Sequence, residues 1–181
     1  MRIGPLRLRD SCDDDVVPIS RIYGHWVEHG LASFELKPPS VEEVARRRET
    51  LIAGRYPYLV IEGEGGILGY AYAGPYRTRP AYRFACEDSV YIAPDAAGQG
   101  IGRRLLEGLI ARCETSGFRL MVAVIGDSGN AASIGLHNAL GFSQAGILPC
   151  IGWKHERWVD SFLMTRPLGE GSASAPVERL L

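Results

Sequence analysis

The chain has 181 residues, of which 46% are hydrophobic and 23% charged, and its formal net charge is −1. These values predict one globular domain with a sizeable core. They exclude the basic field of a nucleic-acid-binding protein, and no apolar run approaches the roughly 20 residues of a membrane span. The start of the chain lacks the apolar region of a signal peptide. Four scattered cysteines argue against a disulfide framework or a cysteine zinc site and favour the cytoplasm: Cys12, Cys86, Cys113 and Cys150.

The first part of the chain predicts a short strand followed by two helices. Residues 6–9 alternate apolar and basic side chains, as strands do. Three aspartates then precede apolar residues at helical spacing, and Gly30 is expected to end this first helix. After a loop at residues 31–39, Ser40 and Glu43 have the spacing of a capping box, so a second helix is expected from there to about Ala53.

The remainder predicts strands that first form a hairpin and later alternate with helices. A turn at residues 63–66 separates the first two of these strands, and the apolar run at 120–125 is typical of a strand buried on both faces. We expect strands at 58–62, 67–73, 83–92, 120–125, 142–150 and 158–165, and helices at about 100–116 and 131–140. This order predicts an α/β fold with a mixed sheet and helices on both faces. Residues 1–168 are expected to form the domain and 169–181 a flexible tail.

The stretch from Glu87 to Leu106 predicts a strand, a glycine-rich turn and the start of a helix. Pro94 ends the strand, and glycines at positions 98, 100 and 102 allow a tight turn. Free N–H groups at a helix start form a site for a phosphate, although a plain turn with a helix cap would have the same sequence features. The glycine spacing and the absence of a following Lys-Ser or Lys-Thr exclude the P-loop and the dinucleotide fingerprint.

Several motifs at matching spacing carry a family resemblance. They are Tyr56-Pro57-Tyr58-Leu59-Val60, Ala71-Tyr72-Ala73-Gly74-Pro75-Tyr76, Glu87-Asp88-Ser89-Val90-Tyr91-Ile92, Val122-Ala123-Val124-Ile125-Gly126, Asn130, His137-Asn138-Ala139-Leu140-Gly141-Phe142, and Lys154-His155 with Trp158 and Asp160. From about Leu6 to Leu168 the chain resembles the GNAT superfamily of acyl-CoA-dependent N-acetyltransferases. Within it, the pattern is similar to the branch that acetylates phosphinothricin and methionine sulfoximine. The resemblance implies the GNAT-like acyl-CoA N-acyltransferase fold, with a mostly antiparallel sheet.

The resemblance implies acetyl-CoA as co-substrate and no metal. Backbone groups of Val90, Tyr91 and Ile92 would hold the acetyl group and the pantetheine arm. The amide of Asn130 would contact the pantetheine, cap a helix, or do both. Ala97 stands where the family usually has Gln or Arg, so a long side chain is missing there. The pyrophosphate would be bound by Ala97, Gly98, Gln99, Gly100, Ile101, Gly102 and Arg103.

Two residues match the family's catalytic positions. Glu87 would be the general base, and its alternative is a surface carboxylate paired with Arg83. Asp88 is a weaker candidate, because adjacent strand residues face opposite sides. His137 stands where many members have a tyrosine, and would act as general acid, only bind, or merely pack near the core.

The acceptor implied by the resemblance is the α-amine of a small amino acid or analogue, with phosphinothricin, methionine sulfoximine and methionine sulfone as leading candidates. Arginine side chains suit the acceptor's carboxylate, and two aromatic rings could form walls for its side chain. The predicted substrate-binding residues are Phe34, Tyr76, Arg77, Arg79, Arg83 and Glu87. Transfer would be direct in a ternary complex, since no cysteine falls at a family-like nucleophile position and Cys86 is the only cysteine near the site. A homodimer through the C-terminal strands, a cytoplasmic location and a role in resistance are further implications.

Other functions fit parts of the sequence. The stretch His25-Trp26-Val27-Glu28-His29 matches the inverted zinc-protease pattern, but no third ligand stands out. A non-catalytic acyl-CoA-binding module would keep the glycine turn while losing Glu87 or the acceptor site. Acetylation of protein N-termini or of polyamines would use the same fold, although a polyamine favours a more acidic pocket than this arginine-bearing loop predicts.

Overall fold

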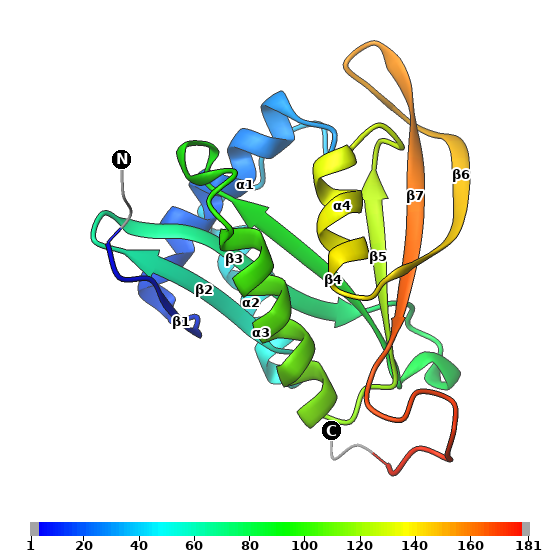
Figure 1. Ribbon diagram of the computed structural model, residues 1–181. Helices are drawn as coiled ribbons and strands as arrows, with labels where there is room; N and C mark the ends of the chain where they lie inside the picture. Colours follow the sequence, from blue (N-terminus) through cyan, green and yellow to red (C-terminus); the bar gives the residue numbers. More distant parts are fainter. Residues whose placement is uncertain (1–3, 179–181) are drawn as a thin grey trace.

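The computed structural model describes residues 4–178 as one sheet with helices on both faces (Figure 1). The strands are β1 (Arg7–Asp10), β2 (Tyr58–Gly63), β3 (Gly66–Pro75), β4 (Ala85–Ile92), β5 (Leu120–Gly126), β6 (Ser143–Lys154) and β7 (Arg157–Pro167). The helices are α1 (Val16–His29), α2 (Val41–Ala53), α3 (Ile101–Thr115) and α4 (Ala131–Ala139), with short 3₁₀ turns at Asp13–Asp15, Pro80–Tyr82 and Pro94–Ala96. The predicted order of elements is confirmed.

The sheet has the order β1-β2-β3-β4-β5-β7-β6 and is antiparallel except between β4 and β5. This confirms the mixed, mostly antiparallel α/β architecture. Figure 1 shows α3 and α4 in front of the sheet and α1 and α2 behind it. The helices α3 and α4 therefore share one face, and α1 and α2 share the other.

The parallel pairing between β4 and β5 is short. It covers four residue pairs, from Ala85 opposite Leu120 to Asp88 opposite Ala123. The neighbouring seams β3–β4 and β5–β7 each have seven pairs. Beyond Asp88 the two strands diverge, as Figure 1 shows, and we call the space between residues 89–92 and 124–126 the β4–β5 wedge. Strand residues in the wedge lack a partner strand on one side, so their backbone groups are open to a ligand.

Apolar packing fixes the elements around this wedge. On one face, Leu105, Leu106 and Leu109 of α3 are fully buried against the sheet. Full burial of such a side chain is worth about 1.5–3 kcal/mol. On the other face, Ile19 of α1 is buried near a row of stacked tyrosines on β2 and β3, namely Tyr58, Tyr70 and Tyr72. The indole Nε1 of Trp26 on α1 donates to the carbonyl oxygen of Ile92 at 2.7 Å and so secures the free end of β4.

Three local predictions are corrected by the structure. The C-terminal strands are longer than expected, because β6 and β7 meet at a two-residue turn rather than at a loop from 152 to 157. His155 and Glu156 adopt φ values of 49° and 58°, which suits a tight hairpin turn without the usual glycine. Ser40 accepts a hydrogen bond from the N–H of Glu43 as predicted, but the Glu43 carboxylate binds Arg46 and Arg47 instead of closing the capping box. Residues 83–84 precede β4 instead of belonging to it.

The segment after β7 has no helix or strand over residues 168–178. Leu168 is nevertheless fully buried, and Arg119 donates to Ser174 and to the carbonyl of Ala175. The described part of this segment therefore contacts the domain. Residues 179–181 of the predicted tail and residues 1–3 of the predicted domain lie outside the described residues. No helix within residues 4–178 has the length and apolar character needed to cross a membrane.

Candidate active site

The glycine-rich turn leads directly into α3. Gly98 and Gly100 have φ values of 75° and 77°, a conformation that costs a side-chain-bearing residue roughly 1–2 kcal/mol. Ile101, the first residue of α3, is 1% exposed and anchors the start of the helix in the core. The first intrahelical bond comes from the N–H of Arg104 to the carbonyl of Gly100, so the preceding N–H groups remain available to an anion.

The polar side chains of the turn bind neighbouring groups of the chain. The amide Nε2 of Gln99 donates to the carbonyl of Asp95 at 3.2 Å and stabilises the turn. Arg103 pairs with Glu107 one helical turn further on, at 2.8 Å. Because Ala97 provides no polar side chain, the groups that this turn can offer to an anion are chiefly its backbone N–H groups.

The β4–β5 wedge contains a cavity of about 60 Å³. Its walls come from both strands, from α4 and from the loop that follows α1: Ala32, Asp88, Ser89, Val90, Tyr91, Ala123, Val124, Ile125, Gly126, Asn130, Ser133 and His137. Asn130 caps α4 by accepting from the N–H of Ser133 at 3.1 Å. This bond uses Oδ1, so both roles expected for Asn130, cap and ligand contact through Nδ2, are compatible.

Glu87 lies on β4 at the closed end of the wedge. It is opposite Val122 in the parallel register, and its side chain shares the face of the sheet with Val122 and Val124. Burial, reinforced by the nearby charge of Asp88, raises the pKa of Glu87 to about 7. A carboxyl group with this pKa is divided evenly between acid and base forms at neutral pH, which suits a general base.

Asp88 points to the opposite face and forms a buried pair with His137 of α4. Oδ2 of Asp88 lies 3.0 Å from Nε2 of His137, and the two side chains are among the most buried polar groups described, with residue exposures of 7% and 4%. Nδ1 of His137 lies 2.7 Å from the carbonyl oxygen of Ser133. Burial alone would lower the pKa of His137, but the hydrogen bond and charge of Asp88 raise it above its ordinary value.

A second hollow opens on the Glu87 face of the sheet and meets the wedge cavity at Val124. This apolar groove has a volume of about 440 Å³ and is lined by Phe34, Leu36, Val124, Leu148, Ile151, Gly152, Trp153 and Ser161. Ser161 on β7 is opposite Gly126, so its side chain faces the groove side, and its buried hydroxyl has no hydrogen-bond partner among residues 4–178. The groove therefore combines apolar walls with one unsatisfied hydroxyl.

The loop that carries Phe34 is fixed by contacts with the last hairpin. A Cβ at position 152 would collide with the ring of Phe34, so Gly152 lets this ring lie against β6. Lys154, which is 3% exposed, donates from Nζ to the carbonyl oxygen of Ser33 at 2.7 Å. Burial lowers the pKa of Lys154. The hydroxyl groups of Tyr23 and Ser33 are 2.9 Å apart and add a contact with α1.

The predicted arginines lie apart from the wedge. Arg77 and Arg79 line a separate open hollow of about 430 Å³ with Thr78 and Tyr82, and it shares no lining residue with the wedge cavity. Arg77 also lies over the ring of Tyr76, which contacts Tyr82 edge-on. Arg83 forms an ion pair with Glu178 of the C-terminal segment at 3.0 Å rather than with Glu87.

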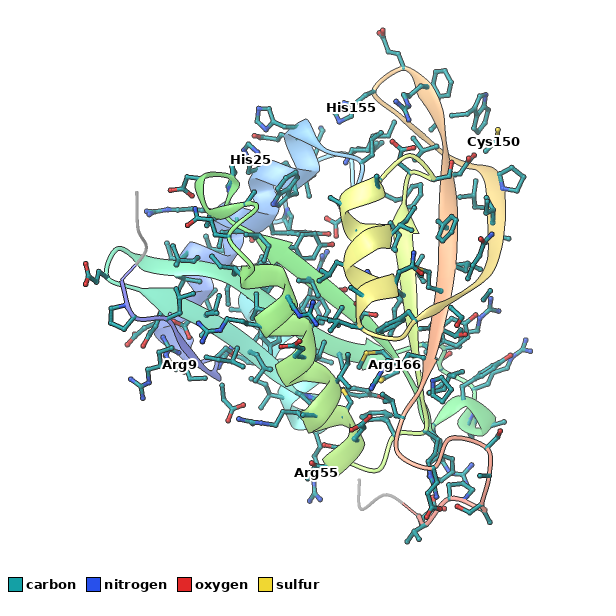
Figure 2. The ribbon with its side chains drawn as sticks, viewed as in Figure 1. Arg9, His25, Arg55, Cys150, His155 and Arg166 are labelled. Carbon is teal, nitrogen blue, oxygen red and sulfur yellow. The ribbon has the colours of Figure 1, made fainter. Side chains whose placement is uncertain are left out.

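The histidines of the His-x-x-Glu-His motif lie away from the wedge cavity, and neither cysteine described below is among its lining residues. His25 and His29 stack 4.7 Å apart at the outer end of α1, and no cluster of three or more His, Cys, Asp or Glu suited to a metal occurs within residues 4–178. Figure 2 shows His25 on this helix and Cys150 at the outer edge of the β6–β7 hairpin. Cys86 is buried, and its Sγ contacts the carbonyl oxygen of Leu120 at 3.6 Å.

Sequence reasoning missed three contributions to this site. It ranked Asp88 only as a weaker base and did not pair it with His137, although the two residues belong to motifs that it had singled out. No contact was predicted for Lys154, and Ser161 was not among the predicted site residues. A serine within the alternating apolar strand Val159–Leu163 was the one available signal for Ser161.

Comparisons with known proteins identify the family of this chain. The model of the acetyltransferase (GNAT) family matches residues 25–142. The chain is 52% identical to a phosphinothricin N-acetyltransferase of Alcaligenes faecalis, over 97% of this chain and 92% of that protein. It is 38% identical to the L-methionine sulfoximine/L-methionine sulfone acetyltransferase of Pseudomonas aeruginosa, over 93% of this chain and 98% of that one. A GNAT superfamily phosphinothricin acetyltransferase of Sinorhizobium meliloti, solved with acetyl-CoA, superposes with a TM-score of 0.93 at 47% identity, covering 96% and 94% of the two chains. The chain belongs to the GNAT family, and it is an acetyl-CoA-dependent N-acetyltransferase.

Proposed function

We propose that this enzyme acetylates the α-amine of a small amino acid or analogue, of the phosphinothricin and methionine sulfoximine type, by direct transfer from acetyl-CoA in a ternary complex. The observation that carries the proposal is the position of Glu87. Its carboxyl group has a pKa of about 7 and lies on the same face of the sheet as Val124, the residue that lines both the wedge cavity and the apolar groove. The names of two relatives, a phosphinothricin and a methionine sulfoximine acetyltransferase, support this substrate class.

In this proposal the coenzyme and the acceptor approach from opposite sides. The pyrophosphate binds the turn at residues 97–103, and the pantetheine passes through the wedge along Val90, Tyr91 and Ile92. Backbone N–H groups of β4 in the wedge have no β5 partner and would stabilise the oxyanion that forms on the acetyl carbonyl. Asn130 at the α4 end of the cavity adds a contact to the pantetheine.

The acceptor occupies the face of Glu87. Glu87 removes a proton from the amine, directly or through a water molecule, and the amine then attacks the acetyl carbonyl carbon. The side chain of the acceptor lies in the apolar groove against Phe34, and Ser161 donates to an oxygen of its sulfoximine, sulfone or phosphinate group. His137 supplies the proton that the leaving thiolate takes up. Arg77 and Arg79 are the candidates for the acceptor's carboxylate, because Arg83 is already paired with Glu178.

A thiol-release assay tests this function. Purified enzyme and acetyl-CoA are combined with phosphinothricin, methionine sulfoximine, methionine sulfone, the common amino acids, a short peptide with a free N-terminus and a polyamine. We expect turnover with amino-acid analogues that carry a polar tetrahedral group. Turnover with the peptide or the polyamine alone would replace the proposed substrate class. Binding of acetyl-CoA measured by calorimetry, without turnover of any acceptor, would favour a non-catalytic binding module.

We also propose that the enzyme is a homodimer which functions in the cytoplasm, where acetyl-CoA is supplied, and protects against toxic amino-acid analogues. The dimer contact would use apolar side chains of the β6–β7 hairpin that do not line the apolar groove, Ile147 and Trp158, which are 43% and 60% exposed. Large apolar side chains exposed in this way are typical of an interaction site. Sedimentation analysis at micromolar concentration should give twice the mass of the chain, and a monomer at all concentrations would contradict the proposal.

A further inference from the structure

The Asp88–His137 pair holds one proton whose location the geometry restricts. The carbonyl oxygen of Ser133 can only accept, so Nδ1 of His137 must carry a hydrogen. The 3.0 Å contact between Nε2 and Oδ2 of Asp88 then needs one further proton between the two atoms. Without it, a nitrogen lone pair would face a carboxylate oxygen in a buried space. The pair thus contains an imidazolium with a carboxylate, or their neutral equivalent.

The pair is also connected to the wedge. Asp88 and His137 both line the wedge cavity, and Asp88 is the last residue of β4 that is paired with β5. Oδ1 of Asp88 is buried and has no hydrogen-bond partner in the described part of the chain. A purely structural ion pair would be expected to have all of its buried oxygens satisfied. This oxygen is therefore left to bind a ligand or a water molecule in the wedge cavity, which Asp88 lines.

Among the groups packed around His137, Asp88 is the charged one that affects the protonation of the imidazole. On β4 the other titratable side chains are Cys86, Glu87 and Tyr91, of which Glu87 and Tyr91 lie on the opposite face. β5 and the rest of α4 contain no titratable group, and the ring of Phe142 packs edge-on against the imidazole at 4.9 Å. Arg166 on β7 is paired with Glu114 of α3.

We propose that Asp88 is a positioning residue for acetyl transfer, which acts through His137 by keeping the imidazole doubly protonated and oriented beside the path of the thioester. This inference rests on the proposed function, because it assigns the source of the proton for the leaving group. When the tetrahedral intermediate collapses, the C–S bond breaks and its electron pair goes to sulfur. The proton on Nε2 then forms the S–H bond of coenzyme A, directly or through one water molecule.

The proton balance closes through solvent. After the transfer His137 is neutral and keeps only the Nδ1 hydrogen that Ser133 accepts. Its Nε2 lone pair then faces the ionised Asp88, so uptake of a proton from solvent is favoured and restores the pair. The acceptor's ammonium group loses two protons on the way to the amide, one before the attack and one from the nitrogen of the tetrahedral intermediate, and Glu87 passes each of them to solvent on the other face of the sheet. Two protons leave and one enters in each cycle, which matches the conversion of an ammonium and a thioester into an amide, a thiol and one released proton.

Asp88→Asn tests the inference, because asparagine has nearly the same shape and its Oδ1 can still accept from the Nε2–H of His137, but it carries no charge. We expect kcat to fall about 10- to 100-fold, with the KM for acetyl-CoA changed less than about twofold. The alkaline limb of the kcat profile should move to lower pH by about one unit or more, because His137 loses the charge that stabilises its protonated form. Asp14→Asn, which changes an exposed aspartate far from the site, is the matched control and should behave as the wild type. A variant that loses stability but keeps kcat and its pH profile would overturn the inference.

A spectroscopic measurement does not depend on turnover or on the folding of a variant. The chain has only four histidines, so ¹⁵N NMR of the imidazole groups can be assigned by substituting the other three in turn. In the wild-type enzyme we expect both nitrogens of His137 to be protonated at pH 7. A neutral imidazole at this pH would refute the role of Asp88. If the NMR result holds but no acceptor is turned over, the proposed function fails while the paired proton stands.

Discussion

Glu87→Gln should slow the enzyme and stabilise its fold at the same time. Glutamine keeps the size and hydrogen-bonding capacity of the side chain but cannot accept the proton of the amine. Loss of a general base of this kind costs roughly 10²- to 10⁴-fold in rate. In the wild type, where burial and Asp88 raise the pKa of Glu87 to about 7, the base form makes up about one tenth of the enzyme at pH 6 and about nine tenths at pH 8. The acid limb of kcat/KM should therefore be centred near pH 7.

The stability effect follows from the same pKa. A carboxyl group whose pKa is raised from 4.5 in the unfolded chain to about 7 in the folded one binds more protons when folded, so stability falls as pH rises between these values. The full penalty above pH 7 would be ~3 kcal/mol. Because Glu87 is only partly buried, screening by water reduces this to ~1.5 kcal/mol. Glutamine removes the penalty, which for a chain of this size raises Tm by about 4 °C at pH 8 and changes little at pH 4.

The assay combines thiol release with thermal unfolding at pH 4, 6 and 8 for the wild type and the variant. Glu49→Gln is the matched control, because Glu49 is an exposed residue of α2. A Glu87→Gln enzyme with activity within about threefold of wild type would show that Glu87 is not the base. An unfolding difference that does not change with pH would show that the carboxyl group is not destabilised by burial.

Three further predictions concern the turn, the groove and the hairpin. Gly100→Ala should raise the KM for acetyl-CoA about tenfold at nearly constant kcat. A φ near 77° costs alanine roughly 1–2 kcal/mol, so the backbone would shift and displace the N–H groups proposed to bind the pyrophosphate. Gly65→Ala, at an unconstrained position, is the control and should leave KM unchanged. Ser161→Ala should raise the KM for methionine sulfone about fivefold and leave that for methionine unchanged, by loss of one hydrogen bond; equal effects on the two acceptors would place the hydroxyl outside the site. Ile147→Asp should shift the sedimentation mass from two chains to one, and an unchanged mass would move the dimer contact elsewhere.

Local chemistry made much of the fold predictable. The strand, glycine turn and helix start around residues 87–106 are encoded by neighbouring residues, and their bounds differ from the expected ones by only one or two positions. The turn at His155 and Glu156 was missed because neither residue is a usual choice for positive φ. The conformation of this turn is determined by the register of the two long strands, and that register is set by residues far from the turn.

The site was less accessible to sequence reasoning, because its partners come from distant parts of the chain. Asp88 and His137 are 49 residues apart and meet only through the parallel pairing of β4 with β5 and the return of α4. The contact of Lys154 with Ser33 spans 121 residues. The three arginines are close in sequence and were expected to act together, yet Arg83 pairs with Glu178 while Arg77 and Arg79 line a separate hollow. Proximity along the chain is a poor guide where a loop lets side chains diverge.

The short seam between β4 and β5 also links the enzyme's lifetime to metabolism. With four residue pairs against seven on either side, the pairing of β4 with β5 joins the two halves of the sheet by a short contact. In the proposed site a coenzyme would bridge the halves, and it would add ~2.7 kcal/mol of stability when its concentration is about a hundred times Kd. If proteases attack the chain through opening of this pairing, a cell rich in acetyl-CoA would retain more of this enzyme than a starved one. The co-substrate would then set the amount of the catalyst as well as its rate.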